Sequence, residues 1–138
     1  MPTFEYRKYY RADAVLKVKY RTIKEPVISG VAFSKNISSV GISMLTSASF
    51  EKGAELELNV YLKEGERPLF AKGKVLWLIP CQVGAKKNKK YYTVGVQIYE
   101  MSPEHAIMQS DFVKDVITAQ SDEESRTIIK NLEEEELK

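Results

Sequence analysis

The sequence predicts a mainly β fold, a six-stranded antiparallel β-barrel followed by C-terminal α-helices. Six segments between residues 14 and 98 have the apolar alternation or the β-branched composition of strands. The connections between them are short and contain no helical pattern, which favours antiparallel neighbours. From residue 102 onward the apolar spacing becomes helical. Because an antiparallel sheet of this size must hide its edges, we expect it to close into a barrel.

The first three strands are predicted at residues 14–20, 27–34 and 42–46. In the first strand, apolar residues occupy every second position, as a half-buried strand requires. These residues are Ala14, Leu16, Val18 and Tyr20. The second strand is β-branched and apolar around Gly30, and a glycine inside a strand often marks a bulge or a bend.

The last three strands are predicted at residues 55–62, 69–79 and 92–98, and the first of these has the clearest alternation in the chain. Trp77 falls on the face of the middle strand that alternation assigns to the interior. We therefore expect Trp77 to fill the barrel core. The lysine-rich stretch 84–90 is expected to be a solvated hairpin loop between the last two strands.

Two helices are predicted after the barrel. The first begins at Ser102, an N-cap candidate that is followed by proline at the first helical position. Its barrel-facing stripe is expected to consist of Met108, Phe112, Val113, Val116 and Ile117. The second begins at Ser121, which forms a capping-box pattern with Glu124. Its narrow apolar stripe consists of Ile128, Ile129 and Leu132. We expect this helix to fray at its end, because four consecutive glutamates oppose the helix dipole.

The 138 residues are expected to form one domain with three parts: a flexible arginine-bearing arm at 1–12, the barrel at 13–101 and a helical extension at 102–138. Hydrophobic residues make up 43% and charged residues 29%, as in an ordinary soluble protein. No apolar stretch is long enough to cross a bilayer, and the N-terminus lacks the apolar region of a secretory signal. Cys81, the only cysteine, is consistent with a reducing compartment. We expect a cytoplasmic location without membrane insertion.

The sequence has none of the patterns expected of an enzyme. It lacks a combination of nucleophile, base and orienting group, and it lacks a phosphate-binding loop of the form G-x-x-x-x-G-K. His105 is the only histidine, and it is not accompanied by cysteines or carboxylates in metal-binding spacing. We therefore expect no catalytic residue, no metal and no cofactor.

Two short motifs carry the functional signal. Arg7 and Arg11 lie four positions apart in a basic segment, since residues 1–24 contain seven Lys or Arg against two acids. A guanidinium group combines a permanent charge with a planar fork of donors, which suits phosphate oxygens and flat bases. Asn36, Ser38 and Gly41 form N-x-S-x-x-G, which by itself is typical of an Asx-type turn closed by a glycine with positive φ.

In this order, R-x-x-x-R followed by N-x-S-x-x-G resembles the signature of the PilZ domain, the bacterial receptor module for cyclic di-GMP. The five motif positions are matched by Arg7, Arg11, Asn36, Ser38 and Gly41. The G-x-V-x-W segment at 73–77 and the last strand at 94–98 resemble the same family. The resemblance implies a PilZ-like split barrel whose ligand, cyclic di-GMP, is bound by these five residues.

The resemblance also implies a receptor whose arm is pinned across the barrel by the ligand and which signals to an unidentified partner protein. Cyclic di-GMP carries two negative charges and two guanines, and an arginine fork can meet guanine O6 and N7 or grip a phosphate. The family suggests control of motility, surface polysaccharide or virulence, and the sequence does not choose among them. It also leaves open whether the stripe at Ile128, Ile129 and Leu132 makes a homodimer.

Two alternatives remain open at the level of sequence. A small barrel that binds single-stranded nucleic acid is favoured by the aromatic residues among the basic ones, but a net charge of only +2 argues against nucleic acid as a partner. These aromatic residues are Phe4, Tyr6, Tyr9, Tyr10 and Tyr20. A degenerate PilZ-like module that binds proteins without a nucleotide is the second alternative, and the intact motifs argue against it.

Overall fold

The structure is a computed structural model, and it describes residues 12–63, 65–81 and 90–137. Within this part of the chain there are seven strands and one helix. They are β1 (Ala12–Asp13), β2 (Lys17–Thr22), β3 (Ser29–Ile37), β4 (Gly41–Thr46), β5 (Glu55–Tyr61), β6 (Leu69–Pro80), β7 (Tyr92–Met101) and α1 (Pro103–Glu136). The prediction for the lysine-rich stretch 84–90 lies almost entirely outside the described residues.

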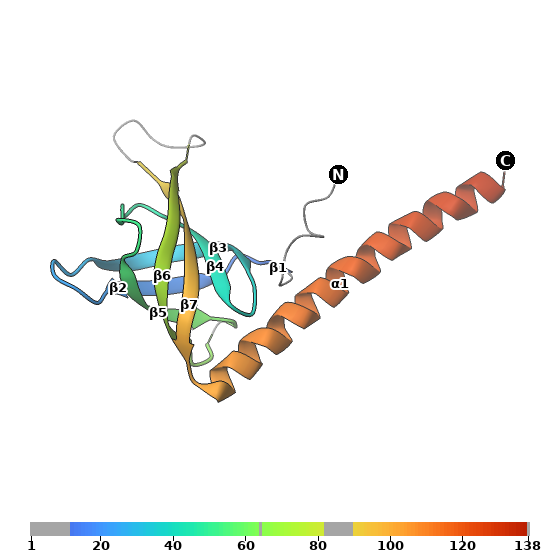
Figure 1. The fold of residues 1–138 in the computed structure, drawn as a ribbon. Coiled ribbons are helices and arrows are strands. Elements are labelled where there is room, and N and C mark those ends of the chain that lie inside the picture. The colour runs from blue at the N-terminus through green and yellow to red at the C-terminus, as the bar shows by residue number, and fades with distance from the viewer. Residues whose placement is uncertain (1–11, 64, 82–89, 138) are drawn as a thin grey trace.

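Six of the strands form a closed antiparallel barrel (Figure 1). The strands follow the order β3, β2, β5, β6, β7, β4, and β4 then pairs with β3 to complete the ring. The short strand β1 pairs with β3 along the same edge as β2. The predicted fold class, a six-stranded antiparallel barrel with a helical C-terminus, is therefore confirmed.

The barrel core consists of the inward-facing residues of all six strands. In β5, Leu56, Leu58 and Val60 are fully buried, and the residues between them are half-buried. This strand is the one whose alternation was clearest in the sequence, and its prediction is confirmed. Burial of side chains of this size contributes about 1.5–3 kcal/mol each to stability.

Trp77 does not fill the core, contrary to the sequence prediction. Val75 is 1% exposed, whereas Trp77 is 37% exposed. The cause is a register shift between these two residues in the pairing of β6 with β7. The extra residue, Leu76, reverses the facing of the strand beyond it, so that Trp77 points outward.

The C-terminal region is one continuous helix rather than the two that were predicted. Ser102 caps α1 as expected, since its hydroxyl accepts the His105 backbone N–H at 3.2 Å. The helix does not end near Ser121, because no proline or glycine interrupts the chain there. It continues through the four glutamates and ends at Glu136.

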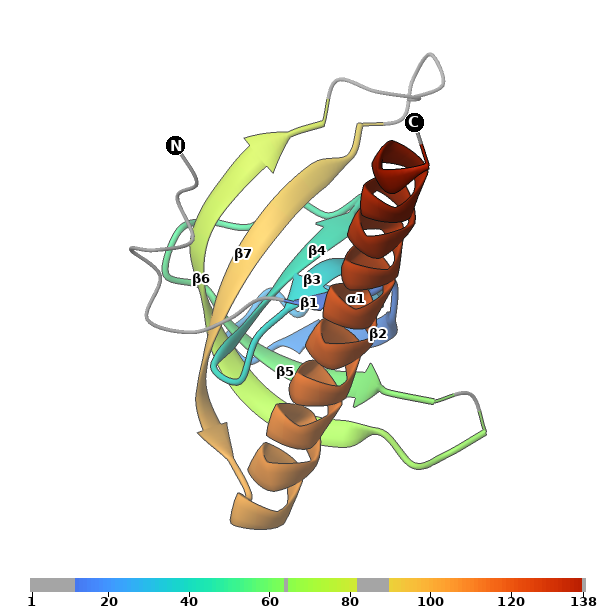
Figure 2. The same cartoon turned by 90° about the vertical axis from the view of Figure 1, so that its right-hand side faces the viewer.

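Only the first half of α1 is covered by the barrel. Figure 2 shows the helix crossing one side of the barrel, and Figure 1 shows its C-terminal half extending away from it. Every described residue from Ser121 onward is exposed. Within the predicted stripe, Phe112, Val113, Val116 and Ile117 pack on the barrel, but Met108 is 41% exposed. The neighbouring Gln109 is fully buried instead. No described helix is both long and apolar enough to span a membrane.

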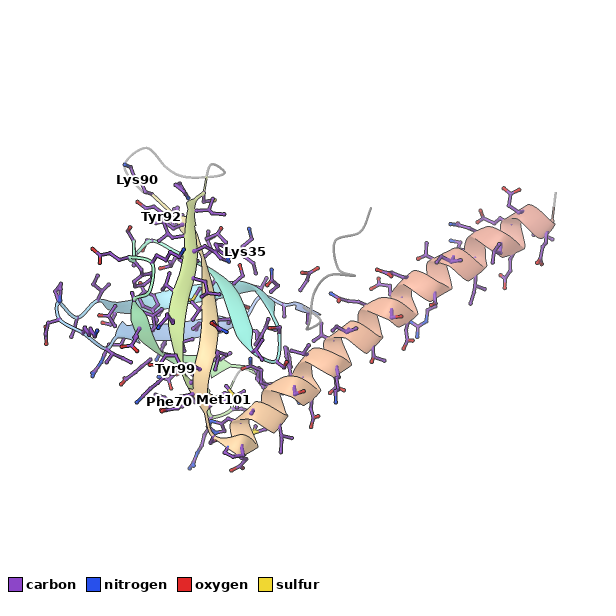
Figure 3. The ribbon with its side chains drawn as sticks, viewed as in Figure 1. Lys35, Phe70, Lys90, Tyr92, Tyr99 and Met101 are labelled. Atoms are coloured by element: carbon purple, nitrogen blue, oxygen red, sulfur yellow. The ribbon has the colours of Figure 1, made fainter. Side chains whose placement is uncertain are left out.

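The start of α1 is fixed to the beginning of β6. The Phe70 backbone N–H donates to His105 Nδ1 at 3.1 Å. Figure 3 shows Phe70, Tyr99 and Met101 at the end of the barrel where α1 begins. Partial burial raises the pKa of the Tyr99 hydroxyl, and the nearby Glu55 carboxylate raises it further, so this phenol is neutral near pH 7.

Ser34 bridges the break between β1 and β2. Its hydroxyl accepts the Leu16 N–H at 2.8 Å and donates to the Ala14 carbonyl at 2.5 Å. The Ser34 backbone N–H also donates to the Leu16 carbonyl at 2.8 Å. Ser34 is only 1% exposed, so water cannot replace its hydroxyl. This side chain therefore determines how the chain enters the barrel after β1.

We predict that Ser34→Ala lowers the free energy of unfolding by about 1–3 kcal/mol, because it leaves a buried donor and acceptor without their partner. Urea unfolding followed by circular dichroism measures this change. Ser29→Ala is the matched control, because Ser29 lies on the same strand and is exposed. The control should change stability by less than about 0.5 kcal/mol. Equal effects of the two substitutions would contradict the bridging role.

Candidate functional site

The pairing of β1 with β3 brings the two sequence motifs together. Arg7 and Arg11 themselves lie outside the described residues. Ala12, which follows Arg11 directly, is the antiparallel partner of Ile37, and Asp13 is the partner of Asn36. Partners in such a ladder have Cα atoms about 4.5–5.5 Å apart. The chain that follows the second arginine therefore runs directly beside the N-x-S-x-x-G segment.

The N-x-S-x-x-G segment connects β3 to β4, as the resemblance implies. Asn36 is the penultimate residue of β3, and Gly41 is the first residue of β4. A register shift between Ser34 and Asn36 marks a bulge in the pairing of these two strands. Asn36 is half-buried at this bulge, and Lys35 before it is exposed (Figure 3).

Ser38 closes the turn with both its backbone and its side chain. Its N–H donates to the Gly41 carbonyl at 2.9 Å, and its Oγ accepts the Val40 N–H at 3.3 Å. Only 9% of Ser38 is exposed. The Val40 carbonyl in turn accepts the Ile98 N–H at 2.8 Å, which fixes the turn to β7. The Ser38 hydroxyl is thus held in place by contacts within the protein itself.

Gly41 is required by close packing and not by its backbone angles. The turn pattern predicts a positive φ at Gly41, and this prediction is wrong. The described glycines with positive φ are Gly53 and Gly65. A Cβ atom on Gly41 would lie 2.9 Å from the Val96 carbonyl oxygen of β7. That oxygen belongs to the backbone and cannot move without disturbing the β4–β7 pairing.

An open cavity of about 280 Å³ lies beside the turn. Three of the five predicted site residues, Asn36, Ser38 and Gly41, line it. The lining residues that complete it are Val40, Ile42, Ser43, Leu76, Trp77, Gly95, Val96 and Gln97. The structure therefore joins the predicted turn to residues of β6 and β7 that the sequence analysis did not assign to the site.

Trp77 forms one wall of this cavity and lies against Gly95. A Cβ atom on Gly95 would be only 2.1 Å from Cε2 of the indole, so the ring occupies the space that a side chain would need. Alternation alone placed Trp77 in the core, and the bulge that turns it outward depends on pairing between strands. Gly95, the partner of Trp77 on β7, was the one feature of the sequence that could have indicated an outward-facing ring at this position.

The described lining of the cavity is uncharged. Its residues are amides, hydroxyls, glycines and apolar side chains. A negatively charged ligand in this cavity would therefore need cations from residues other than these. Among the described residues, no group of three or more His, Cys, Asp or Glu side chains is placed to hold a metal ion.

A model of the PilZ domain family matches residues 5–113. The chain belongs to the PilZ domain family. This match includes both arginines, the whole barrel and the first third of α1. The fold of this PilZ domain thus agrees with the family that the two motifs resemble. No match was found among curated proteins.

Solved structures of other PilZ proteins share this fold. The inhibitor of motility MotI from Bacillus subtilis is 26% identical, with a TM-score of 0.61, and the match covers 84% of this chain and 52% of MotI. The PilZ domain of YcgR from Escherichia coli, solved with c-di-GMP, is 12% identical, with a TM-score of 0.65 and coverage of 86% and 97%. MrkH from K. pneumonia is 15% identical, with a TM-score of 0.64 and coverage of 83% and 50%. The chain spans about half the length of MotI and MrkH.

We predict that Gly95→Ala displaces the Trp77 ring, because the new methyl group would overlap the indole. Trp77 is the only tryptophan, so its fluorescence reports this site alone. Emission should shift to longer wavelength and acrylamide quenching should increase. Gly53→Ala is the control for backbone strain alone, since its positive φ disfavours alanine but no atom lies within 4 Å of the added Cβ. An unchanged spectrum for Gly95→Ala would contradict the described position of the ring.

Proposed function

We propose that the chain is a receptor for cyclic di-GMP, which changes conformation on binding and signals to a separate partner protein. The observation that carries this proposal is the pairing of Ala12 and Asp13 with Ile37 and Asn36. This pairing puts the residues that directly follow the arginine motif beside the N-x-S-x-x-G segment, which lines the cavity. Membership of the PilZ family supports the choice of ligand. The role is that of a receptor, not of an enzyme.

The described cavity accounts for one half of the chemistry that such a ligand requires. Amides and hydroxyls at Asn36, Ser38 and Gln97 can hydrogen-bond to guanine edges, and the half-exposed indole of Trp77 offers a flat apolar face. Arg7 and Arg11 would supply the positive charge for two phosphates. The amide of Asn36 is a weaker acceptor than a carboxylate would be for guanine N–H groups.

The size of the cavity supports a ligand held between two parts of the chain. Its volume of about 280 Å³ is near the lower end of the range for ligand pockets, about 300–1,000 Å³. A molecule with two guanines would therefore extend beyond the cavity. We infer that the arginine segment covers the exposed part, so that binding changes the surface presented to the partner.

Two of the structural neighbours support this proposal through their own ligands. The YcgR domain was solved with c-di-GMP, and MrkH was also solved as a complex with c-di-GMP. Both are under 25% identical to this chain, so the likeness by itself establishes only the shared fold. Cyclic di-GMP as the ligand of this chain is our proposal. We also infer a cytoplasmic location, which is consistent with a single cysteine that cannot form an internal disulfide.

We predict that cyclic di-GMP binds in calorimetric titration with saturation, and that Arg7→Ala or Arg11→Ala weakens the affinity at least about 30-fold, because each removes a charge-assisted contact worth roughly 2 kcal/mol or more. Lys8→Ala is the matched control, since it removes a charge from the same segment outside the motif. The control should bind nearly as the wild type does.

Two outcomes would contradict the proposal. Equal loss from Lys8→Ala and the arginine variants would indicate nonspecific charge attraction. An absence of saturable binding by the wild type would favour the nucleotide-free interaction module instead. Binding of an oligonucleotide that weakens steeply with salt would favour the nucleic-acid alternative.

We further propose that the apolar stripe on the second half of α1 pairs with the same stripe of a second copy of the chain. Ile128, Ile129 and Leu132 are 58%, 53% and 57% exposed. They lie on one side of a helix that the barrel does not cover at this point. A second helix across this stripe would remove these side chains from water, which stabilises the pair.

We predict that light scattering gives a mass of twice the 15.8 kDa chain, and that Leu132→Lys returns it to the mass of one chain. A buried lysine at the centre of the stripe would lose its hydration. Thr127→Lys is the matched control, because it adds the same charge to an exposed position away from the stripe. A wild-type chain that stays monomeric at high concentration would remove this part of the proposal.

A further inference from the structure

Gln109 connects α1 to the turn of the candidate site. Its side-chain Nε2 donates to the Ser38 carbonyl oxygen at 2.7 Å. The two residues are 71 positions apart in the chain, and Gln109 is completely buried. The orientation of the amide follows from the partner, because only the NH₂ end can donate to a carbonyl. The helix thus holds the backbone of a motif residue directly.

The other end of the same amide is not satisfied. Among the described residues, Gln109 Oε1 is the buried side-chain atom that has no hydrogen-bond partner. A buried acceptor without a partner costs free energy, which offsets the gain from the Nε2 bond to the Ser38 carbonyl. Stability alone therefore does not account for a glutamine at this position.

The same helix also supports the second half of the site. α1 contacts β1, the strand that carries the chain from Arg11 to its position beside Asn36. Val113, one turn after Gln109, is the second buried residue of α1 and packs in the barrel core. α1 thus contacts both the strand that follows the arginine segment and the turn.

We propose that Gln109 is a positioning residue for the ligand site, and that it couples cyclic di-GMP binding at the turn to the docking of α1 on the barrel. This inference rests on the proposed function and adds a route by which the site communicates with the helix. The Ser38 carbonyl is held from one side by Gln109, while the Ser38 N–H and Oγ hold Gly41 and Val40. Without the Gln109 contact, the turn would keep its own bonds but lose its attachment to α1.

Coupling of this kind is reciprocal. If the docked helix favours the binding geometry of the turn, bound ligand must favour the docked helix by the same factor. Couplings between sites are typically about 5- to 150-fold in affinity. The effect is therefore measurable from either end, as a change in ligand affinity or as a change in the protection of the helix.

The test replaces Gln109 with methionine, which has a similar length and no donor. We expect Gln109→Met to leave the melting temperature of the ligand-free protein close to the wild-type value, because the lost bond to the Ser38 carbonyl is offset by removal of the unsatisfied Oε1. We expect its dissociation constant for cyclic di-GMP, measured by calorimetric titration, to rise about tenfold. Loss of packing alone would lower the melting temperature, so the two readouts separate positioning from stability.

Gln120→Met is the matched control. Gln120 lies on the same helix eleven residues later, three turns on, and is half-buried. Within the described part of the chain, the helix residue that hydrogen-bonds to the turn is Gln109 and not Gln120, so Gln120→Met should leave the affinity within about twofold of the wild type. Gln109→Leu serves as a second variant if Gln109→Met does not fold.

Hydrogen exchange of the wild-type protein gives the reciprocal measurement. Cyclic di-GMP should slow exchange of the α1 amides at 105–117 by about fivefold or more, and the amides after Ser121 should not change. Unchanged exchange at 105–117, or wild-type affinity in Gln109→Met, would overturn the coupling while leaving the receptor intact. A wild-type protein that does not bind cyclic di-GMP would instead overturn the proposed function.

Discussion

Closure of the barrel on β3 is the constraint on which the rest of the structure depends. This strand pairs with β1 and β2 along one edge and with β4 along the other. Because a slip by one residue would exchange its inner and outer faces, the apolar core fixes the register. The register in turn fixes where β3 ends, and the Asn36–Gly41 segment begins there. The candidate site therefore obtains its geometry from the same pairing that holds the barrel together.

In this arrangement, one part of the chain forms the cavity and another part carries the positive charge. The barrel supplies a cavity whose described lining has no charged side chain, with a turn that is hydrogen-bonded to itself and to β7. The positive charge of the motif lies in the segment before β1. A rigid scaffold that presents polar groups, combined with a separate charged segment, lets binding order one part without deforming the other.

The features that the sequence predicted correctly depend on local patterns. The period of two in β5 and the turn between β3 and β4 can be read from neighbouring residues. Trp77 was misplaced because the bulge in β6 is set by pairing with β7. A second helix that begins at Ser121 would require the first helix to end before Ser121, but no residue there ends it. The burial of Gln109 could not be predicted from the sequence. It depends on a distant partner, the Ser38 carbonyl, which accepts the hydrogen bond of the amide.

The uninterrupted length of α1 makes it a lever arm. From Gln109 to Glu136 the helix spans about 40 Å at a rise of 1.5 Å per residue. A tilt of ~10° at the barrel would carry the far end through ~7 Å over such a span. A tilt too small to reorganise the barrel would thus produce a large displacement at the end of the helix that extends into solvent. The length of the helix would determine the size of that displacement.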